Sequence, residues 1–217
     1  MRLTAIAFGV ALLASPLSAK SFQEMFPDIH AELPADLIAE IDALDLREGL
    51  VTIEGGIATL TLNRPDKLNA WRGEMDRDVR AAMREAADDP AVKVIILTGA
   101  GKGFCAGADM NMLQTIQSGD ASTSRSAVNA LEPWDKTANE HFQKQYSWFP
   151  AVQKPIIAAI NGAAAGLGLI ISLYCDIRFA SDKAKFTTAF SRRGLVAEHG
   201  ISWLLPRLIG FANAAGP

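Results

Sequence analysis

The sequence has little cysteine and no recognisable metal-binding pattern. Its 217 residues include only Cys105 and Cys175, which are far apart and form no Cys-x-x-Cys pair. This spacing argues against a zinc site and a disulfide framework, and it predicts two buried thiols. Cys105 as a nucleophile is the alternative, although the sequence identifies no base for it. The Gly-x-Ser-x-Gly motif of serine hydrolases is also missing.

The chain lacks an excess of positive charge as well. Lys and Arg number 21 and Asp and Glu number 24, for a net charge of −3. Nucleic-acid binding normally needs a basic patch, so nucleic acid is not an expected partner. No repeat period is evident, which argues against a solenoid. What the sequence does have is 49% hydrophobic residues, enough for one domain with a sizeable core.

The apolar stretch at the N-terminus is short. It covers residues 3–14, follows Arg2, and is succeeded by Ser-Pro-Leu-Ser-Ala at 15–19. A membrane-spanning helix needs roughly 20 apolar residues, so no span is expected. The pattern predicts a signal peptide over 1–19, cleaved after Ala19, and hence export. A mispredicted start, or an N-terminal helix packed on a partner, is the alternative.

The rest of the chain alternates strand and helix signals. Residues 20–49 are predicted to form an N-terminal extension with a short helix, and residues 50–217 the core domain. Gly55-Gly56 lies between two apolar runs and predicts a β-hairpin. The other expectations are helices over 74–88, 137–149, 169–174 and 201–209, with the last interrupted by Pro206; strands over 92–98, 155–160, 176–180 and 184–186; a polar loop over 117–135; and buried Trp71, Trp148 and Trp203.

One stretch, residues 92–107, organises this pattern. A buried apolar strand runs into the glycine-rich loop Gly-Ala-Gly-Lys-Gly-Phe-Cys-Ala-Gly and then into a helix start at 108–113. The loop fits neither a dinucleotide fingerprint nor a phosphate loop, because Phe104 replaces the last glycine of the first and Gly103 the Ser/Thr of the second. A flexible crossover is the plain alternative. A second strand, small-residue loop and helix follow at 155–174. Two such units can aim one N–H each at a single oxyanion.

Four segments together resemble the crotonase (enoyl-CoA hydratase/isomerase) superfamily. They begin with Asn-Arg-Pro at 63–65, the glycine loop, Lys-Pro at 154–155 and Cys-Asp at 175–176, and the similarity covers about residues 50–210. The resemblance implies an α/β fold made of a spiral of ββα units. It also implies a CoA thioester substrate, with coenzyme A as part of that substrate and no separate cofactor or metal.

The resemblance assigns site residues. The two oxyanion donors would be the N–H groups of Ala108 and Leu167. It places catalysis in the cytoplasm, where CoA is found, in conflict with the signal-like segment. The residues expected to contact the CoA thioester are Lys67, Leu68, Ala70, Ala106, Gly107, Asp109, Met110 and Gly166. Asp109 is also expected to cap the helix that follows it.

Two departures from the family pattern bear on the reaction. Hydratases of this superfamily use two glutamates, and those places hold Ile170 and Phe190 here. Dienoyl-CoA isomerases and a CoA-dependent dehalogenase have a catalytic aspartate near the place of Glu198, which is therefore the expected acid/base. An apolar pocket would raise the pKa of this carboxyl group. A helix-end charge without a catalytic role is the alternative.

These departures predict an enoyl- or dienoyl-CoA isomerase or a lyase in fatty-acid metabolism. A non-catalytic acyl-CoA binder is the alternative, as is a standard hydratase if the motifs are misaligned. Relatives continue into helices that close the acyl pocket and build a homotrimer or hexamer. The sequence ends at Pro217, so the resemblance predicts a truncated C-terminal helical region and leaves that assembly in question.

Overall fold

The computed structural model describes residues 48–110, 134–191, 194–197 and 199–215. Residues 47–217 form one compact unit. The predicted signal peptide, the helix of the N-terminal extension, nearly all of the polar loop over 117–135, and Glu198 lie outside the described residues.

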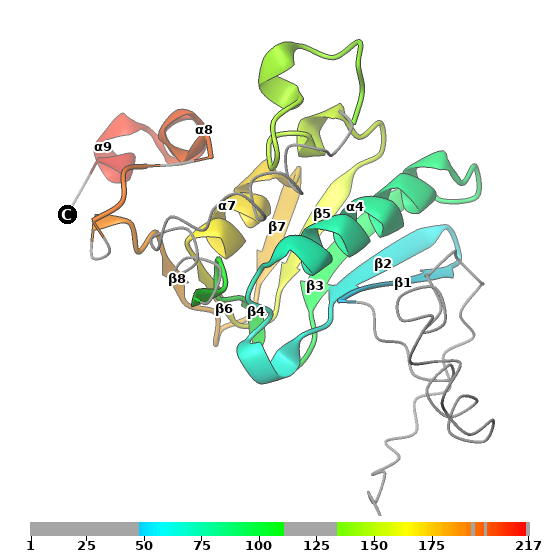
Figure 1. The fold of residues 1–217 in the computed structure, drawn as a ribbon, viewed down its shortest axis with the longest axis horizontal. Coiled ribbons are helices and arrows are strands. Elements are labelled where there is room, and N and C mark those ends of the chain that lie inside the picture. The colour runs from blue at the N-terminus through cyan, green and yellow to red at the C-terminus, as the bar shows by residue number, and fades with distance from the viewer. Residues whose placement is uncertain (1–47, 111–133, 192–193, 198, 216–217) are drawn as a thin grey trace, which may run out of the picture. The chain divides into compact units, whose positions relative to one another are not determined.

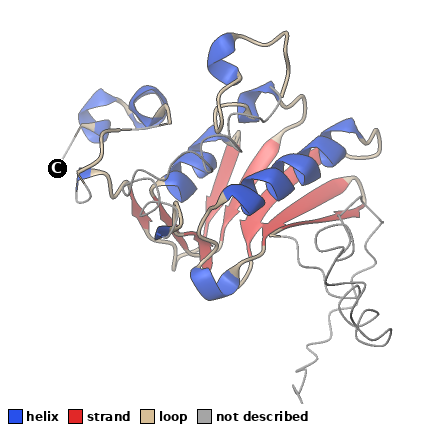
Figure 2. Cartoon of the chain, viewed as in Figure 1, coloured by secondary structure: helices blue, strands red, loops and turns tan. Residues whose placement is uncertain are grey.

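The larger sheet has five strands in the order β1-β2-β3-β5-β7 (Figures 1 and 2). β1 and β2 pair antiparallel across Gly55-Gly56, which confirms the hairpin, and every other pairing is parallel. Buried side chains alternate along β2, β3 and β5, as expected for strands with one face turned to the core. The strands are β1 (Gly49–Glu54), β2 (Ile57–Leu62), β3 (Val94–Gly99), β5 (Ile156–Ile160) and β7 (Ile177–Ala180).

Helix α4 (Gly73–Asp88) lies along this sheet on the side of β1 and β2. Its apolar residues recur every three to four positions, and that stripe is buried. This confirms the helix predicted over 74–88. The same buried face carries an acid, Asp76, which is 1% exposed. The apolar residues of the stripe are Met75, Val79, Ala82, Met83 and Ala86.

The structure has a second sheet of three short strands, of which the sequence predicted only the last, as a strand over 184–186. Its parallel strands are β4 (Gly103–Cys105), β6 (Ala163–Ala165) and β8 (Phe186–Thr187). From β3 onward the chain gives one strand to each sheet in turn, which produces the expected α/β spiral of ββα units. The backbones approach closely here, because a Cβ on Gly162 would lie 2.0 Å from the Lys102 carbonyl oxygen and one on Gly168 2.1 Å from that of Cys105.

The helix predicted over 137–149 is wrong. This segment holds only two 3-10 turns, η2 (Glu140–Phe142) and η3 (Phe149–Ala151). Aromatic packing fixes the segment instead: the Trp134 and Trp148 rings stack at 4.6 Å, and the Trp148 and Phe149 rings at 4.3 Å. Arg84 of α4 lies 4.0 Å from the Trp134 ring centroid. Tertiary contacts have thus overridden local helix propensity.

The end of the described chain contains α8 (Ile201–Ile209), which was predicted over these residues. The short α9 (Phe211–Ala214) that follows was not predicted. Pro206 lies inside α8 without interrupting it, contrary to the expectation. Trp71 and Trp148 are buried as predicted, but Trp203 on α8 is 50% exposed, so its prediction as a core residue is wrong. Among the described residues, no helix has the length and apolar character needed to cross a membrane.

Candidate active site

The main chain before Ala108 lies against the start of α7 (Leu167–Tyr174). A Cβ on Gly107 would lie 2.8 Å from the Ala165 carbonyl oxygen and 3.7 Å from the Leu167 nitrogen. Gly107 has φ of +98°, a conformation that favours glycine. Leu167 is the first residue of α7, where helix N–H groups have no partner within the helix. The structure therefore brings the two predicted oxyanion donors into neighbouring segments.

Trp71 holds Ala108 from one side. The Trp71 N–H donates to the Gly107 carbonyl oxygen at 2.7 Å, and the Asp109 N–H donates to the Trp71 carbonyl oxygen at 2.9 Å. This parallel bridge uses the carbonyl before Ala108 and the N–H after it, so the N–H of Ala108 itself faces away from Trp71. Within the described part of the chain, no hydrogen bond uses the N–H of Ala108 or of Leu167.

Two asparagines that the sequence analysis did not single out hold the glycine loop. The Asn69 side-chain amide donates to the carbonyl oxygens of Ala100 (3.0 Å) and Gly103 (2.8 Å). The Asn161 amide donates to Gly99 (2.8 Å) and Gly101 (3.0 Å). Both asparagines occur in the motif segments, at strand or turn ends, and this position is the sequence signal that could have identified them.

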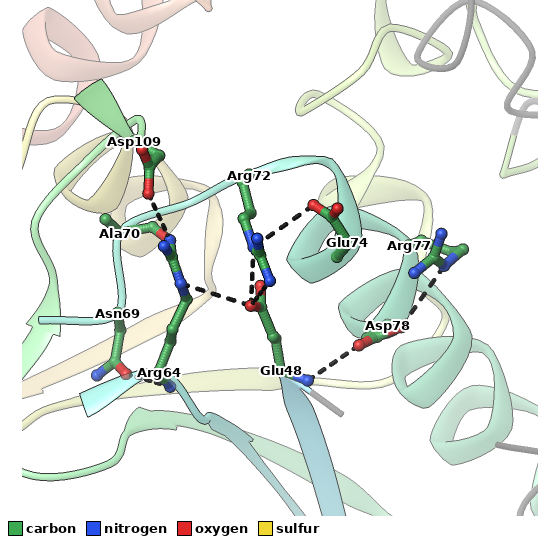
Figure 3. A network of polar contacts seen from close by, with 9 residues as sticks. All are labelled: Glu48, Arg64, Asn69, Ala70, Arg72, Glu74, Arg77, Asp78 and Asp109. Carbon is green, nitrogen blue, oxygen red and sulfur yellow. Dashed lines mark hydrogen bonds and ion pairs between the residues drawn. The ribbon is translucent and has the colours of Figure 1, made fainter. Parts of the chain in front are cut away.

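The carboxylate of Asp109 is buried and forms an ion pair with Arg64 (Figure 3). Its Oδ2 lies 2.7 Å from Nη1 of Arg64, and the residue is 8% exposed. The same Nη1 donates to the Ala70 carbonyl oxygen at 2.8 Å, and Arg64 Nε lies 3.4 Å from Glu48. Arg64 thus ties the segment before α4 to the residue that follows Ala108. Of the helix expected after Asp109, all residues beyond Met110 lie outside the described residues, and so does the predicted cap.

Arg64→Met is expected to lower the free energy of unfolding by roughly 2–3 kcal/mol, because it leaves a buried carboxylate without its cation. The double variant with Asp109→Asn is expected to lose less than the sum. Urea denaturation measures both. Arg77→Met is the control: Arg77 is 64% exposed, 3.7 Å from Asp78, and is expected to cost less than about 0.5 kcal/mol. Equal losses for Arg64 and Arg77 would contradict the role given to Arg64.

The residues predicted to contact CoA form two adjoining segments. The Ala106 N–H donates to the Leu68 carbonyl oxygen at 2.9 Å, which joins residues 67–70 to residues 106–110. Lys67, Leu68 and Met110 are exposed, while Gly107 is buried. Gly166 precedes α7 with φ of +51°. An extended ligand can therefore meet both segments through their exposed edges.

The titratable groups near Ala108 are few among the described residues. Ile170 is fully buried in α7, and no carboxylate stands at it or at Phe190. Burial raises the pKa of Cys105 to about 12, so its thiol is protonated at neutral pH and is no nucleophile. Burial also raises the pKa of Asp76 to about 6. Asp76 lies behind the indole of Trp71, whose Nε1–H donates to it at 3.2 Å. No group of three or more potential metal ligands occurs in the described ranges.

A cavity of about 630 Å³ opens near the other end of α7. Tyr146, Tyr174, His199 and Trp203 are among the residues that line it. The Tyr146 ring meets Trp71 edge-on, with centroids 6.3 Å apart, and meets His199 edge-on at 4.7 Å. Trp71 therefore touches both Ala108 and the cavity wall. Glu198 lies outside the described residues, but the next residue, His199, belongs to this wall.

Comparison with known proteins agrees with this architecture. The family model for enoyl-CoA hydratase/isomerase matches residues 52–216. The 1,2-epoxyphenylacetyl-CoA isomerase of Escherichia coli (strain K12) is 37% identical over 164 residues, which cover 76% of this chain and 59% of that protein.

Two solved structures are similar as well. An enoyl-CoA hydratase from Mycobacterium avium subsp. paratuberculosis K-10 has a TM-score of 0.58 at 31% identity, covering 79% of this chain and 62% of that one. Enoyl-CoA hydratase subunit I from Geobacillus kaustophilus HTA426 has a TM-score of 0.64 at 29% identity, covering 77% and 59%. This chain thus spans about three fifths of the length of these relatives, and it belongs to the enoyl-CoA hydratase/isomerase family.

Proposed function

We propose that this chain is an acyl-CoA enzyme that stabilises a thioester enolate between the N–H groups of Ala108 and Leu167. The observation that carries the proposal is the contact of Gly107 with the start of α7, which sets these two groups in neighbouring segments. Donors aimed at a developing oxyanion stabilise it most in a site from which water is excluded. The CoA moiety lies along residues 67–70 and 106–110.

The reaction we propose is an isomerisation with Glu198 as acid/base. Its carboxylate takes a proton from the α or γ carbon of the thioester, the electron pair is held as the enolate, and the proton returns to a different carbon. A lyase-type reaction through the same enolate is the nearest alternative. The name of the E. coli relative, an isomerase of an acyl-CoA, supports isomerisation over the lyase-type reaction. The apolar Ile170 and Phe190 favour a second candidate, an acyl-CoA binder without catalysis.

Leu167→Pro tests the oxyanion site. Proline removes one N–H and is well tolerated at the first position of a helix. A conjugated thioester such as cinnamoyl-CoA should absorb at longer wavelength when bound, because the two donors polarise its carbonyl. We expect Leu167→Pro to lose most of this shift. Gly73→Pro, at the first position of α4, is the matched control and should keep it. An unchanged shift in a folded Leu167→Pro protein would refute the oxyanion site.

Crotonyl-CoA tests the class of reaction. We expect it to bind but to be hydrated barely above the uncatalysed rate, because Ile170 and Phe190 have no group that could activate a water molecule or protonate the enolate. Loss of the conjugated thioester absorbance measures hydration. Robust hydration would instead support the standard hydratase and would show that the catalytic positions are misaligned.

A further inference from the structure

The cavity at the end of α7 has walls rich in aromatic rings. Phe142, Tyr146, Tyr174, His199 and Trp203 all line it, and we call it the aromatic cavity. Resting on the proposed function, we infer that the aromatic cavity holds the far end of the acyl group and selects a thioester whose acyl group carries an aromatic ring over one with a linear chain.

The aromatic cavity lies within reach of the proposed oxyanion site. Tyr174 is the last residue of the helix that begins with Leu167, and at 1.5 Å per residue the two are separated by about 10 Å along the helix axis. On the other side, Trp71 bridges to Ala108 through its backbone and meets Tyr146 through its ring. A ring attached a few bonds beyond the thioester carbonyl spans such a distance.

The walls are held in place before any ligand binds. The Tyr174 hydroxyl donates to the His199 carbonyl oxygen at 2.8 Å, which fixes α7 to the segment before α8. Gly200, with φ of +82°, allows this approach: a Cβ there would lie 2.5 Å from the same hydroxyl oxygen. Arg207 lies 4.1 Å from the Trp203 ring centroid. A preformed site spends less of its binding energy on ordering its own side chains.

The chemistry of these walls favours a ring. Aromatic rings attract one another edge-to-face beyond what buried area alone provides, and Tyr146 already meets two neighbours in this way. A rigid ring also loses fewer rotatable bonds on binding than a linear chain with as many carbons. The volume of about 630 Å³ falls within the range of ordinary ligand sites. The half-exposed indole of Trp203, unusual for so large an apolar side chain, thereby gains a role.

The test compares phenylacetyl-CoA with octanoyl-CoA, which has the same number of acyl carbons, and with free CoA, by titration calorimetry on the full chain. We expect phenylacetyl-CoA to bind about tenfold more tightly than octanoyl-CoA. In Trp203→Leu, which keeps an apolar side chain without the ring, this preference should fall to about twofold. Tyr174→Leu should reduce it as well. Affinity for free CoA should not change in either variant.

Phe211→Ala is the control, because Phe211 is 77% exposed on α9 and does not line the aromatic cavity; it should keep the full preference. Equal binding of the two thioesters, or a preference that survives in both Trp203→Leu and Tyr174→Leu, would overturn the inference and leave the proposed function intact. If free CoA and both thioesters fail to bind, the proposed function itself falls.

Discussion

Replacing Glu198 by glutamine is expected to reduce turnover by about 10²–10⁴-fold, the usual contribution of a positioned acid or base. Glutamine keeps the size of the side chain but cannot accept the proton. Acyl-CoA affinity should change little, because the proposed CoA contacts come from residues 67–70 and 106–110. Two measurements check this: turnover of the thioester found by a mass-spectrometric screen of acyl-CoAs, and exchange of its α and γ protons in deuterated water.

Glu54→Gln is the matched control, since Glu54 is an exposed residue at the end of β1. It should leave both turnover and proton exchange unchanged. If Glu198 is only a charge near the start of α8, its replacement should instead cost about 0.3–1 kcal/mol of stability with full turnover. Undiminished proton exchange in Glu198→Gln would remove this residue from the mechanism.

Trp148→Ala is expected to lower the free energy of unfolding by about 3–5 kcal/mol. Trp148 is 1% exposed and stacks against Trp134 and Phe149. Arg80 of α4 lies 5.0 Å from its ring centroid. The substitution therefore removes a large buried ring that several neighbours share, and the cavity left behind cannot close easily. Urea denaturation measures the loss.

Trp203→Ala is the comparison for this prediction. Trp203 is half exposed, so its loss should cost less than about 1 kcal/mol, although it lines the aromatic cavity. Trp148→Phe should recover part of the loss, because a smaller ring can still stack. Similar losses for Trp148→Ala and Trp203→Ala would mean that the segment 134–151 is not anchored by its aromatic residues.

The sequence predicts the parts of this fold that depend on neighbouring residues. The Gly55-Gly56 hairpin is set by a two-residue turn, and α4 by apolar residues three to four positions apart. The apolar strands β3 and β5 were also recognisable, with boundaries shifted by one or two residues. Each of these signals lies within a few residues, so no knowledge of the rest of the chain is needed.

The parts of the fold that the sequence did not predict depend on contacts between distant residues. β4 and β6 have three residues each, too few to show a period, and they become strands only by pairing with each other and with β8. Residues 137–149 were misassigned because Trp148 packs against Arg80 of α4 and stacks on Trp134, which lies outside the segment. Ala108 and Leu167 were predicted as oxyanion donors through the family resemblance, whereas nothing in the sequence predicted the pairing of Asp109 with Arg64. The partner of a carboxylate can be identified only once the fold brings the two residues together.

The parallel pairing of the larger sheet also affects how the protein is made. β3 takes its place between β2 and β5, yet Ile95 pairs with Ile156, 61 positions further along the chain. During synthesis, β3 therefore leaves the ribosome long before its second neighbour exists, and its unpaired edge remains a template for other chains. Contacts so distant in sequence slow folding and prolong exposure of apolar surface. We therefore expect a larger fraction of the overproduced protein to be soluble when it is synthesised slowly at low temperature, because fewer nascent chains are then present at the same time.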